Sequence, residues 1–121
     1  MLPNTTANIS DGTANHVYDL RKTGDWSSTR YEAAAPSDQP ATLEISHKEQ
    51  GKGLKSTRSS LLRFQRVVED ADGNQDVIDA HLVVRYPTKI ATTAQVLATT
   101  NEAINFFGVS TYKTQFLGGE I

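Results

Sequence analysis

The segment Ala41-Thr-Leu-Glu-Ile-Ser-His-Lys48 alternates strictly between two kinds of side chain. One side of the extended chain would be mostly apolar and carry Leu43, Ile45 and His47. The other side would be polar and carry Thr42, Glu44, Ser46 and Lys48. A period of two residues is typical of a β-strand with one packed face and one polar face. The segment therefore predicts a strand in a sheet whose two faces differ in chemistry.

Two longer segments downstream repeat this alternation. Residues 58–68 place Leu62 and Phe64 on one face, and residues 77–86 form an apolar face of Ile78, Ala80, Leu82, Val84 and Tyr86. A Gly- and Lys-rich turn at 49–57 and an acidic loop at 70–75 separate the segments. Pro87 ends the last one, since proline donates no hydrogen bond to a sheet. Three long antiparallel strands are expected.

The flanking segments complete the expected order of elements. Residues 1–15 read as a loose arm or edge segment outside the core, 16–20 and 26–31 as a hairpin around a Gly-containing turn, and 32–40 as a proline-bounded linker. After Pro87 the apolar period becomes helical, from a cap at Thr92-Thr93 to Gly108, which suits the left-handed position after a helix. A short second helix is expected around 112–117, ended by Gly118-Gly119.

The predicted fold class is α+β: an antiparallel β-sheet with an N-terminal hairpin and a C-terminal helix. The 121 residues and 13.2 kDa fit one domain. Its parts are the arm and hairpin (1–35), the central strands (41–87) and the helical segment (92–121). A helix of about 22 Å cannot cover the apolar face of a sheet of five or more strands, which is about 20–25 Å wide. A second copy of the chain could supply the missing cover.

Composition excludes several classes of protein. The chain has no Cys, which excludes disulfides, thiolate zinc sites and a cysteine nucleophile. No apolar run approaches the ~18 residues of a membrane span, and the N-terminus lacks the basic and apolar regions of a signal peptide. No membrane partner is expected.

Charge is unevenly distributed, although the net charge is only −2. Six of the twelve basic residues lie between positions 48 and 66, beside a single acid: Lys48, Lys52, Lys55, Arg58, Arg63 and Arg66. The segment 69–79 carries only acids: Glu69, Asp70, Asp72, Asp76 and Asp79. This segregation is compatible with a polyanion bound to one sheet face, although composition alone favours an ordinary solvated hairpin.

Catalytic and metal-binding patterns are missing from the sequence. His16, His47 and His81 lie in separate strand segments without the spacing of metal ligands. The segment 51–57 resembles a phosphate-binding loop, but Leu54 stands where that motif needs Gly. We expect no enzyme, no metal, no cofactor and no small-molecule substrate.

The central segment Pro40–Lys48, the turn Gly51-Lys52-Gly53 and the segment Arg58-Ser-Ser-Leu-Leu-Arg-Phe64 resemble coat proteins of the single-stranded RNA bacteriophages, the levivirus group. The order of elements agrees across nearly the whole chain. The resemblance implies an intimate homodimer with a continuous antiparallel sheet, in which each helix packs over the partner's sheet. It implies assembly into a T=3 icosahedral shell around genomic RNA, in the cytoplasm of a bacterial host and then in the virion. It also implies possible repression of translation through an RNA hairpin.

The resemblance assigns roles to three groups of residues. The inward, RNA-binding face would hold Thr42, Ser46, Lys48, Arg63, Gln65, His81 and Arg85. The dimer interface would hold Val96, Leu97, Ile104 and Phe107. The loop between dimers would hold Asp70, Asp72, Gly73 and Asn74. Glu44 and Asp79 fall on the expected RNA face and would repel phosphate, and no obvious aromatic residue lies there.

Two alternatives remain open from the sequence. One is a non-viral β-sheet dimer that binds nucleic acid or another polyanion. The other is a small α+β enzyme.

Overall fold

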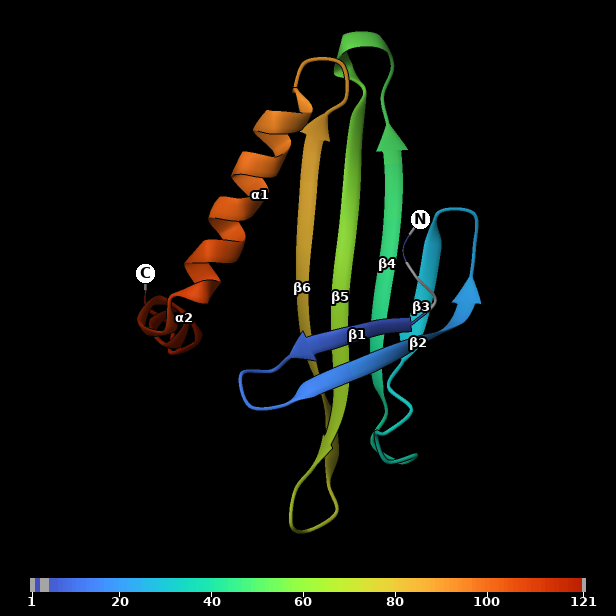
Figure 1. The fold of residues 1–121 in the computed structure, drawn as a ribbon, viewed down its shortest axis with the longest axis vertical. Helices are drawn as coiled ribbons and strands as arrows, with labels where there is room; N and C mark the ends of the chain where they lie inside the picture. The colour runs from blue at the N-terminus through green and yellow to red at the C-terminus, as the bar shows by residue number, and fades with distance from the viewer. Residues whose placement is uncertain (1, 3–4, 121) are drawn as a thin grey trace. The chain divides into compact units, whose positions relative to one another are not determined.

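The computed structural model describes Leu2 and residues 5–120. Six strands form one sheet in the order β1-β2-β3-β4-β5-β6, so each strand pairs with its neighbours in the chain (Figure 1). The strands are β1 (Thr5–Ser10), β2 (Asn15–Thr23), β3 (Ser27–Tyr31), β4 (Ala41–Gln50), β5 (Thr57–Glu69) and β6 (Gln75–Pro87). A 3₁₀ turn, η1 (Gly53–Lys55), lies between β4 and β5, and the helices α1 (Thr93–Gly108) and α2 (Ser110–Leu117) follow β6.

The predicted antiparallel sheet followed by C-terminal helices is confirmed. The hairpin predicted at 16–31 is β2–β3, and the three predicted long strands are β4, β5 and β6. The N-terminal segment contains an edge strand, β1, which pairs with β2. Residues 1, 3 and 4 of the predicted arm lie outside the described residues.

Two compact units make up the chain. The first contains the residues up to Glu49 together with Ser59–Arg85, and it holds most of the sheet. The second contains Gln50–Arg58 and the residues from Tyr86 onward, and it holds the β4–β5 turn and both helices.

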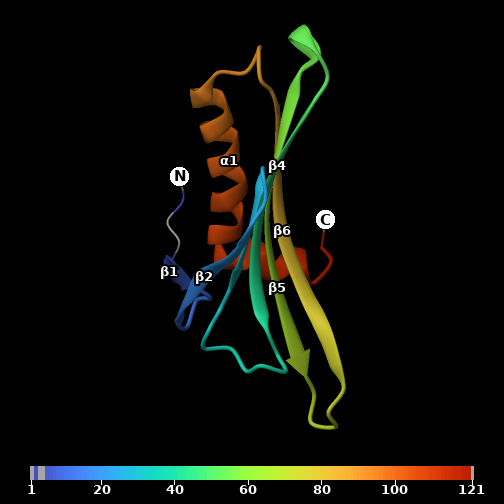
Figure 2. The ribbon, with the colours of Figure 1, turned by 90° about the vertical axis from the view of Figure 1, so that its right-hand side faces the viewer.

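Within the first unit, the sheet curls because β2 pairs with β1 along one part of its length and with β3 along the other. Its first half pairs with β1 and its second half with β3, and Asp19 pairs with both Thr5 and Tyr31. The register with β3 shifts between Leu20 and Lys22, and such a bulge bends a strand and increases its twist. As a result the β1–β2 hairpin lies across one face of β4, β5 and β6, on one side of these strands (Figures 1 and 2).

The core of the first unit lies under this hairpin. Tyr18, Ala41 and Leu43 are at most 4% exposed, and Ile9, Ala35, Ile45, Leu62 and Phe64 pack against them. The rings of Tyr18 and Phe64 meet edge to face, with centroids 5.7 Å apart, a favourable aromatic geometry. The expectation that residues 1–15 contribute nothing to the core is therefore wrong for Ile9. The β1–β2 hairpin covers part of the apolar face of the sheet. From the sequence, only the C-terminal helix and a second copy of the chain were expected to cover this face.

In the second unit, α1 begins with the predicted cap. The Thr92 hydroxyl accepts a hydrogen bond from the backbone N–H of Gln95 at 3.2 Å, and the Gln95 side chain accepts one from the Thr92 N–H at 2.9 Å. This reciprocal pair satisfies two backbone donors that a helix start leaves open. The predicted left-handed position for Gly108 is wrong, because α1 runs through Gly108 and ends at Val109 in an extended conformation.

The second predicted helix is confirmed and starts slightly earlier than expected, at Ser110. Gly119, with a φ of 86°, follows its end. Four aromatic side chains cluster where α1 meets α2. Phe107 contacts Phe106 and Phe116 edge to face, with centroids 5.5 and 5.2 Å apart, and Tyr112 stacks on Phe106 at 5.5 Å.

Candidate nucleic-acid interface

The face of the sheet opposite the core is the candidate site, and we call it the polar face. Arg63 on β5 lies at its centre. Its guanidinium donates to both carboxylate oxygens of Asp79 on β6, at 2.9–3.2 Å, and lies 3.9 Å from Glu44 on β4. Gln65 donates to the same Asp79 carboxylate at 3.4 Å. These contacts join three strands on one face, as the alternation of side chains predicted.

Glu44 and Asp79, the two acids expected to repel phosphate, also form ion pairs with Arg63. The hydrogen bond from Arg63 lowers the pKa of Asp79 from its ordinary value, and the same bond, with the charge of Asp79, raises the pKa of Arg63. Both groups are therefore charged at neutral pH, and the positive charge of Arg63 is compensated locally. The bond is bidentate, which fixes the orientation of the guanidinium.

The remaining predicted RNA-binding residues occupy the same face with different exposure. Thr42, Ser46 and Gln65 are partly buried, whereas Lys48, His81 and Arg85 are exposed. The His81 Nδ1 lies 3.6 Å from Asp79. Within the described part of the chain, no ion pair involves Lys48 or Arg85, so these two residues present uncompensated positive charge.

The polar face also carries an aromatic residue, contrary to the expectation from the sequence. In the β3–β4 register, Arg30 pairs with Leu43 and both are buried, while Tyr31 pairs with Thr42. Directly paired residues share a face of the sheet, so Tyr31 belongs to the polar face, and it is 40% exposed. An exposed aromatic ring is a surface on which an unpaired base can stack. The register between β3 and β4 reveals Tyr31, and the sequence alone does not determine that register.

The loop that joins β5 to β6 has an internal frame. One Asp70 carboxylate oxygen accepts from the backbone N–H groups of Asp72 and Asn74, both at 2.9 Å, and the other accepts from the Asn74 side chain at 3.0 Å. Gly73 has a φ of 86°, a conformation that favours glycine. The hydrogen bond from the Asn74 side chain, followed by the one from its backbone, lowers the pKa of Asp70. The predicted loop residues thus form a compact, exposed turn.

The linker before β4 supports the base of this loop, which the sequence did not reveal. The Gln39 side chain donates to Glu69 at 2.9 Å, and the Gln75 side chain donates to the Asp38 carbonyl at 3.0 Å. The Val67 N–H donates to the Pro40 carbonyl at 3.0 Å. Glu69 and Gln75, at the two ends of the loop, are therefore tied to Gln39 and Asp38 of the linker.

The predicted dimer-interface residues all lie on α1. Val96 is partly buried, and Leu97, Ile104 and Phe107 are 58%, 52% and 42% exposed. No residue of α1 or α2 is buried. The neighbouring Phe106, Tyr112 and Phe116 are also about half exposed. The helical segment therefore presents a large apolar and aromatic surface, in which Phe106, Tyr112 and Phe116 were not predicted from the sequence.

Among the described residues, no group of three or more His, Cys, Asp or Glu side chains could hold a metal ion. The helices described are too short or too polar for any of them to cross a membrane.

Comparison with solved structures shows what this fold resembles. The virus-like particle of bacteriophage AVE019 matches with a TM-score of 0.67 over 98% of this chain and 97% of that chain, at 14% identity. The virus-like particle of bacteriophage GQ-907 matches with a TM-score of 0.73 over 96% and 90%, at 10% identity. The bacteriophage EMS014 coat protein matches with a TM-score of 0.68 over 85% and 72%, at 16% identity.

Comparison with protein-family models and with curated proteins gives no match. The chain has the fold of these bacteriophage coat structures, while its sequence is only 10–16% identical to theirs. The resemblance stated from the sequence is confirmed at the level of the fold.

Proposed function

We propose that this chain is the coat protein of a single-stranded RNA bacteriophage, a structural protein of the virion without catalytic activity. Its homodimers assemble in the cytoplasm of the bacterial host into a T=3 icosahedral shell that encloses the genomic RNA. The observation that carries this proposal is the match of almost the whole fold to the AVE019 virus-like particle. The match covers 98% of this chain and 97% of that chain, which favours the same structural role.

Two features support the dimer. The first is β6, a strand of 13 residues at the end of the strand order. A long edge strand is a template for pairing with another chain, and a second β6 would continue the sheet. The second feature is the half-exposed apolar stripe of α1, formed by Val96, Leu97, Ile104 and Phe107. Covering such a stripe is a common reason for two copies to associate.

The polar face supports RNA contact. Lys48 and Arg85 offer uncompensated positive charge to phosphate, and Arg63 does so when RNA competes with Asp79. Thr42, Ser46, Gln65 and His81 offer hydrogen bonds, and Tyr31 offers a stacking surface. These groups suit a single-stranded RNA segment or the loop of an RNA hairpin. By binding such a hairpin, the chain would also repress translation.

Expression of the full chain in bacteria tests the proposal. We expect particles by electron microscopy and a megadalton species in size-exclusion chromatography, with RNA that resists nuclease until the particle is opened. A stable species near 26 kDa, twice 13.2 kDa, without particles under any assembly condition would contradict the capsid role.

That same outcome would favour the alternative function, a non-viral β-sheet dimer that binds nucleic acid or another polyanion. The polar face supports this alternative too, because it requires the same dimer and the same basic groups. Binding of heparin as tightly as RNA at equal salt would favour it further, since a polyanion site reads charge and not bases.

A further inference from the structure

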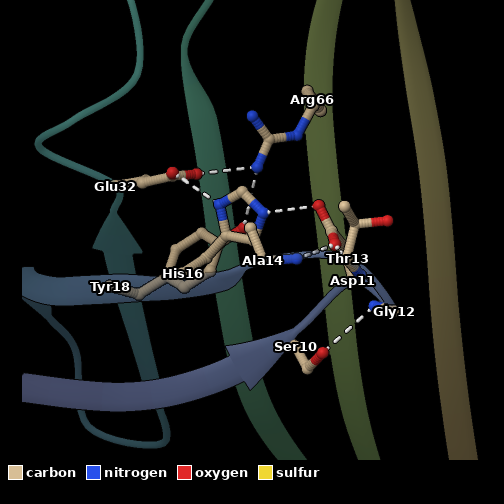
Figure 3. A network of polar contacts seen from close by, with 9 residues as sticks. All are labelled: Ser10, Asp11, Gly12, Thr13, Ala14, His16, Tyr18, Glu32 and Arg66. Atoms are coloured by element: carbon tan, nitrogen blue, oxygen red, sulfur yellow. Dashed lines mark hydrogen bonds and ion pairs between the residues drawn. The ribbon is translucent and has the colours of Figure 1, made fainter.

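A network of charged side chains fastens the tip of the β1–β2 hairpin to the sheet. His16 on β2 lies between two carboxylates: its Nε2 is 2.8 Å from Asp11 in the hairpin turn, and its Nδ1 is 2.6 Å from Glu32 just after β3. The other carboxylate oxygen of Glu32 accepts a hydrogen bond from Arg66 on β5 at 2.7 Å. Figure 3 shows His16 between the two acids, with Arg66 above the ring and bonded to Glu32, and with Tyr18 beside them. We call these four charged residues the latch.

The geometry requires a proton on each ring nitrogen of His16. An ionised carboxylate only accepts hydrogen bonds, and a neutral imidazole has a single N–H to donate. With both nitrogens facing carboxylates, only the imidazolium satisfies both bonds. The latch then contains two cations and two anions and is electrically balanced. Removing the proton would leave a ring nitrogen lone pair facing a carboxylate.

The residues of the latch come from different elements, and further contacts or enclosure restrict their side chains. Asp11 is fixed because its other oxygen accepts from the N–H groups of Thr13 and Ala14, both at 2.8 Å. Glu32 is the most enclosed member, with a side chain only 8% exposed. Arg66 also donates weakly to the Tyr18 hydroxyl, at 3.4 Å. The latch therefore joins the hairpin turn, β2, the end of β3 and β5.

Apolar packing at the hairpin tip is incomplete, so the polar contacts of the latch contribute much of what holds the tip against the sheet. A groove of about 290 Å³ lies there, lined among others by Ile9, Tyr18, Phe64 and Ala80. Of the buried apolar residues described, Ala41 and Leu43 lie in β4, away from the tip, and Tyr18 on β2 is the one near it. Polar contacts thus replace close packing where the hairpin turn meets β5.

We propose that protonated His16 acts as a pH-sensitive latch that holds the hairpin tip against β5, and that loss of this proton releases the tip. The release would expose the apolar face beneath the hairpin. This inference does not depend on the capsid role, because it rests on contacts within one chain.

The electrostatics agree with this direction. The hydrogen bond to Asp11, and then the one to Glu32, raises the pKa of His16 above its ordinary 6.5. The same bond from His16, with those from Ala14 and Thr13, lowers the pKa of Asp11. A raised histidine pKa stabilises the folded state fully below the unfolded value and loses that contribution as pH rises through the folded value. Burial raises the pKa of Tyr18 above 10.0, so Tyr18 does not titrate in this window.

Hydrogen exchange on the intact protein, read by mass spectrometry, tests the latch from about pH 5.5 to about pH 9, across the range in which histidine titrates. Exchange at the imidazole C2 carbon reports the His16 titration, and backbone exchange reports protection of residues 9–18. We expect His16 to titrate above 6.5. Relative to β4, we expect hairpin protection to fall roughly two- to fivefold across that titration. This is the upper part of the range measured for exposed ion pairs, as suits a partly enclosed network.

Three variants make the test decisive. His16→Gln should show low hairpin protection at every pH, whereas His47→Gln, a change at a histidine outside the latch, should keep the pH step. Asp11→Asn keeps the turn acceptor but presents an N–H₂ group to the ring, so the His16 titration should move to lower pH.

A His16 titration at or below 6.5, or hairpin protection that does not change with pH in the parent protein, would overturn the proposal. Retention of the pH step in His16→Gln would do the same. If that variant fails to fold, the parent titration and Asp11→Asn decide the question.

Discussion

Arg63 and Arg85 carry the same charge on the same face but stand in different surroundings. Arg63 is held by Asp79 and Glu44, whereas Arg85 is exposed and no ion pair is found for it within the described residues. Under the proposed RNA-binding function, Arg85→Ala should lower the slope of log affinity against log salt by about 0.7–0.9 for each phosphate that is no longer neutralised. Arg63→Ala should change this slope less, because RNA must first compete with Asp79. Dimer–RNA affinity measured at several salt concentrations tests whether Arg85→Ala lowers the slope more than Arg63→Ala. Equal slopes for both variants would contradict this prediction.

Asp79 then acts as a restraint on RNA binding. Asp79→Asn removes the negative charge but keeps the size of the side chain, so it frees the charge of Arg63 for phosphate. We expect tighter RNA binding and a steeper salt dependence than in the parent. The double variant Arg63→Ala/Asp79→Asn is the matched control and should lose most of this gain. Unchanged affinity in Asp79→Asn would show that Arg63 does not face the RNA.

Glu32 is the residue of the latch whose loss should cost the most stability. Glu32→Gln leaves the Arg66 guanidinium and the His16 ring without their common anion, so we expect unfolding to become easier by about 1–3 kcal/mol near neutral pH. Burial raises the pKa of Glu32, but the hydrogen bonds from His16 and Arg66 and their charges lower it by more, so the net pKa lies below 4.5. A carboxylate with a lowered pKa stabilises above its unfolded value and loses that contribution as pH falls.

Urea unfolding of the parent and of Glu32→Gln over a range of pH measures this effect. The stability difference should be largest between about 4.5 and about 6.5, the ordinary values of the two titrating groups, and should shrink on both sides. A difference that does not vary with pH would contradict the charged form of the network.

At the scale of single residues, the sequence predicted which side chains share a face but not which of them meet. Alternation along β4, β5 and β6 placed Glu44, Arg63 and Asp79 together, and the structure confirms it. The latch was not predicted, because its four residues come from four separate segments. Only the curl of the sheet brings them together.

At the scale of elements, the strands and helices followed from local pattern. Turn residues, the change of period after Pro87 and the cap at Thr92 all correspond to observed boundaries. What failed was the role of the N-terminal segment and the conformation of Gly108. Both depend on contacts between elements: β1 becomes a strand because β2 offers it an edge, and α1 continues through Gly108 directly before α2.

The β5–β6 loop is the element whose change should affect assembly alone. Deleting Gly73-Asn74 removes two of the backbone positions organised by Asp70, while the strands on either side remain tied through Gln39 and Gln75. We expect a folded dimer but altered particle size, stability or yield. Circular dichroism checks the fold, and electron microscopy checks the particles. Particles that stay the same in all three respects would exclude an assembly role for the loop.

At the scale of the whole molecule, the second copy should bind against α1. Ile104 is 52% exposed and takes no part in the aromatic cluster, so Ile104→Asp changes the apolar stripe without disturbing packing between α1 and α2. We expect loss of both soluble dimer and particles, because an unpaired charge would be buried at the interface. Phe107→Asp should do the same but also disrupts the cluster.

Ala98→Asp is the matched control, since residue 98 is exposed and lies on the opposite side of α1. It should leave the dimer and the particles intact. Light scattering of the purified proteins distinguishes the states, and a folded, soluble monomer of Ile104→Asp would contradict an obligate dimer.

The order of the strands has a consequence for how the protein is made. Because every strand pairs only with strands adjacent in the chain, no pairing has to wait for a distant segment to leave the ribosome. Loop closure is cheap for such short connections, and topologies of this kind fold comparatively fast. The sheet can therefore form step by step during synthesis, at a rate independent of protein concentration. The helices leave the ribosome after the strands. Under the proposed function, association of the chains is then the step whose rate depends on protein concentration.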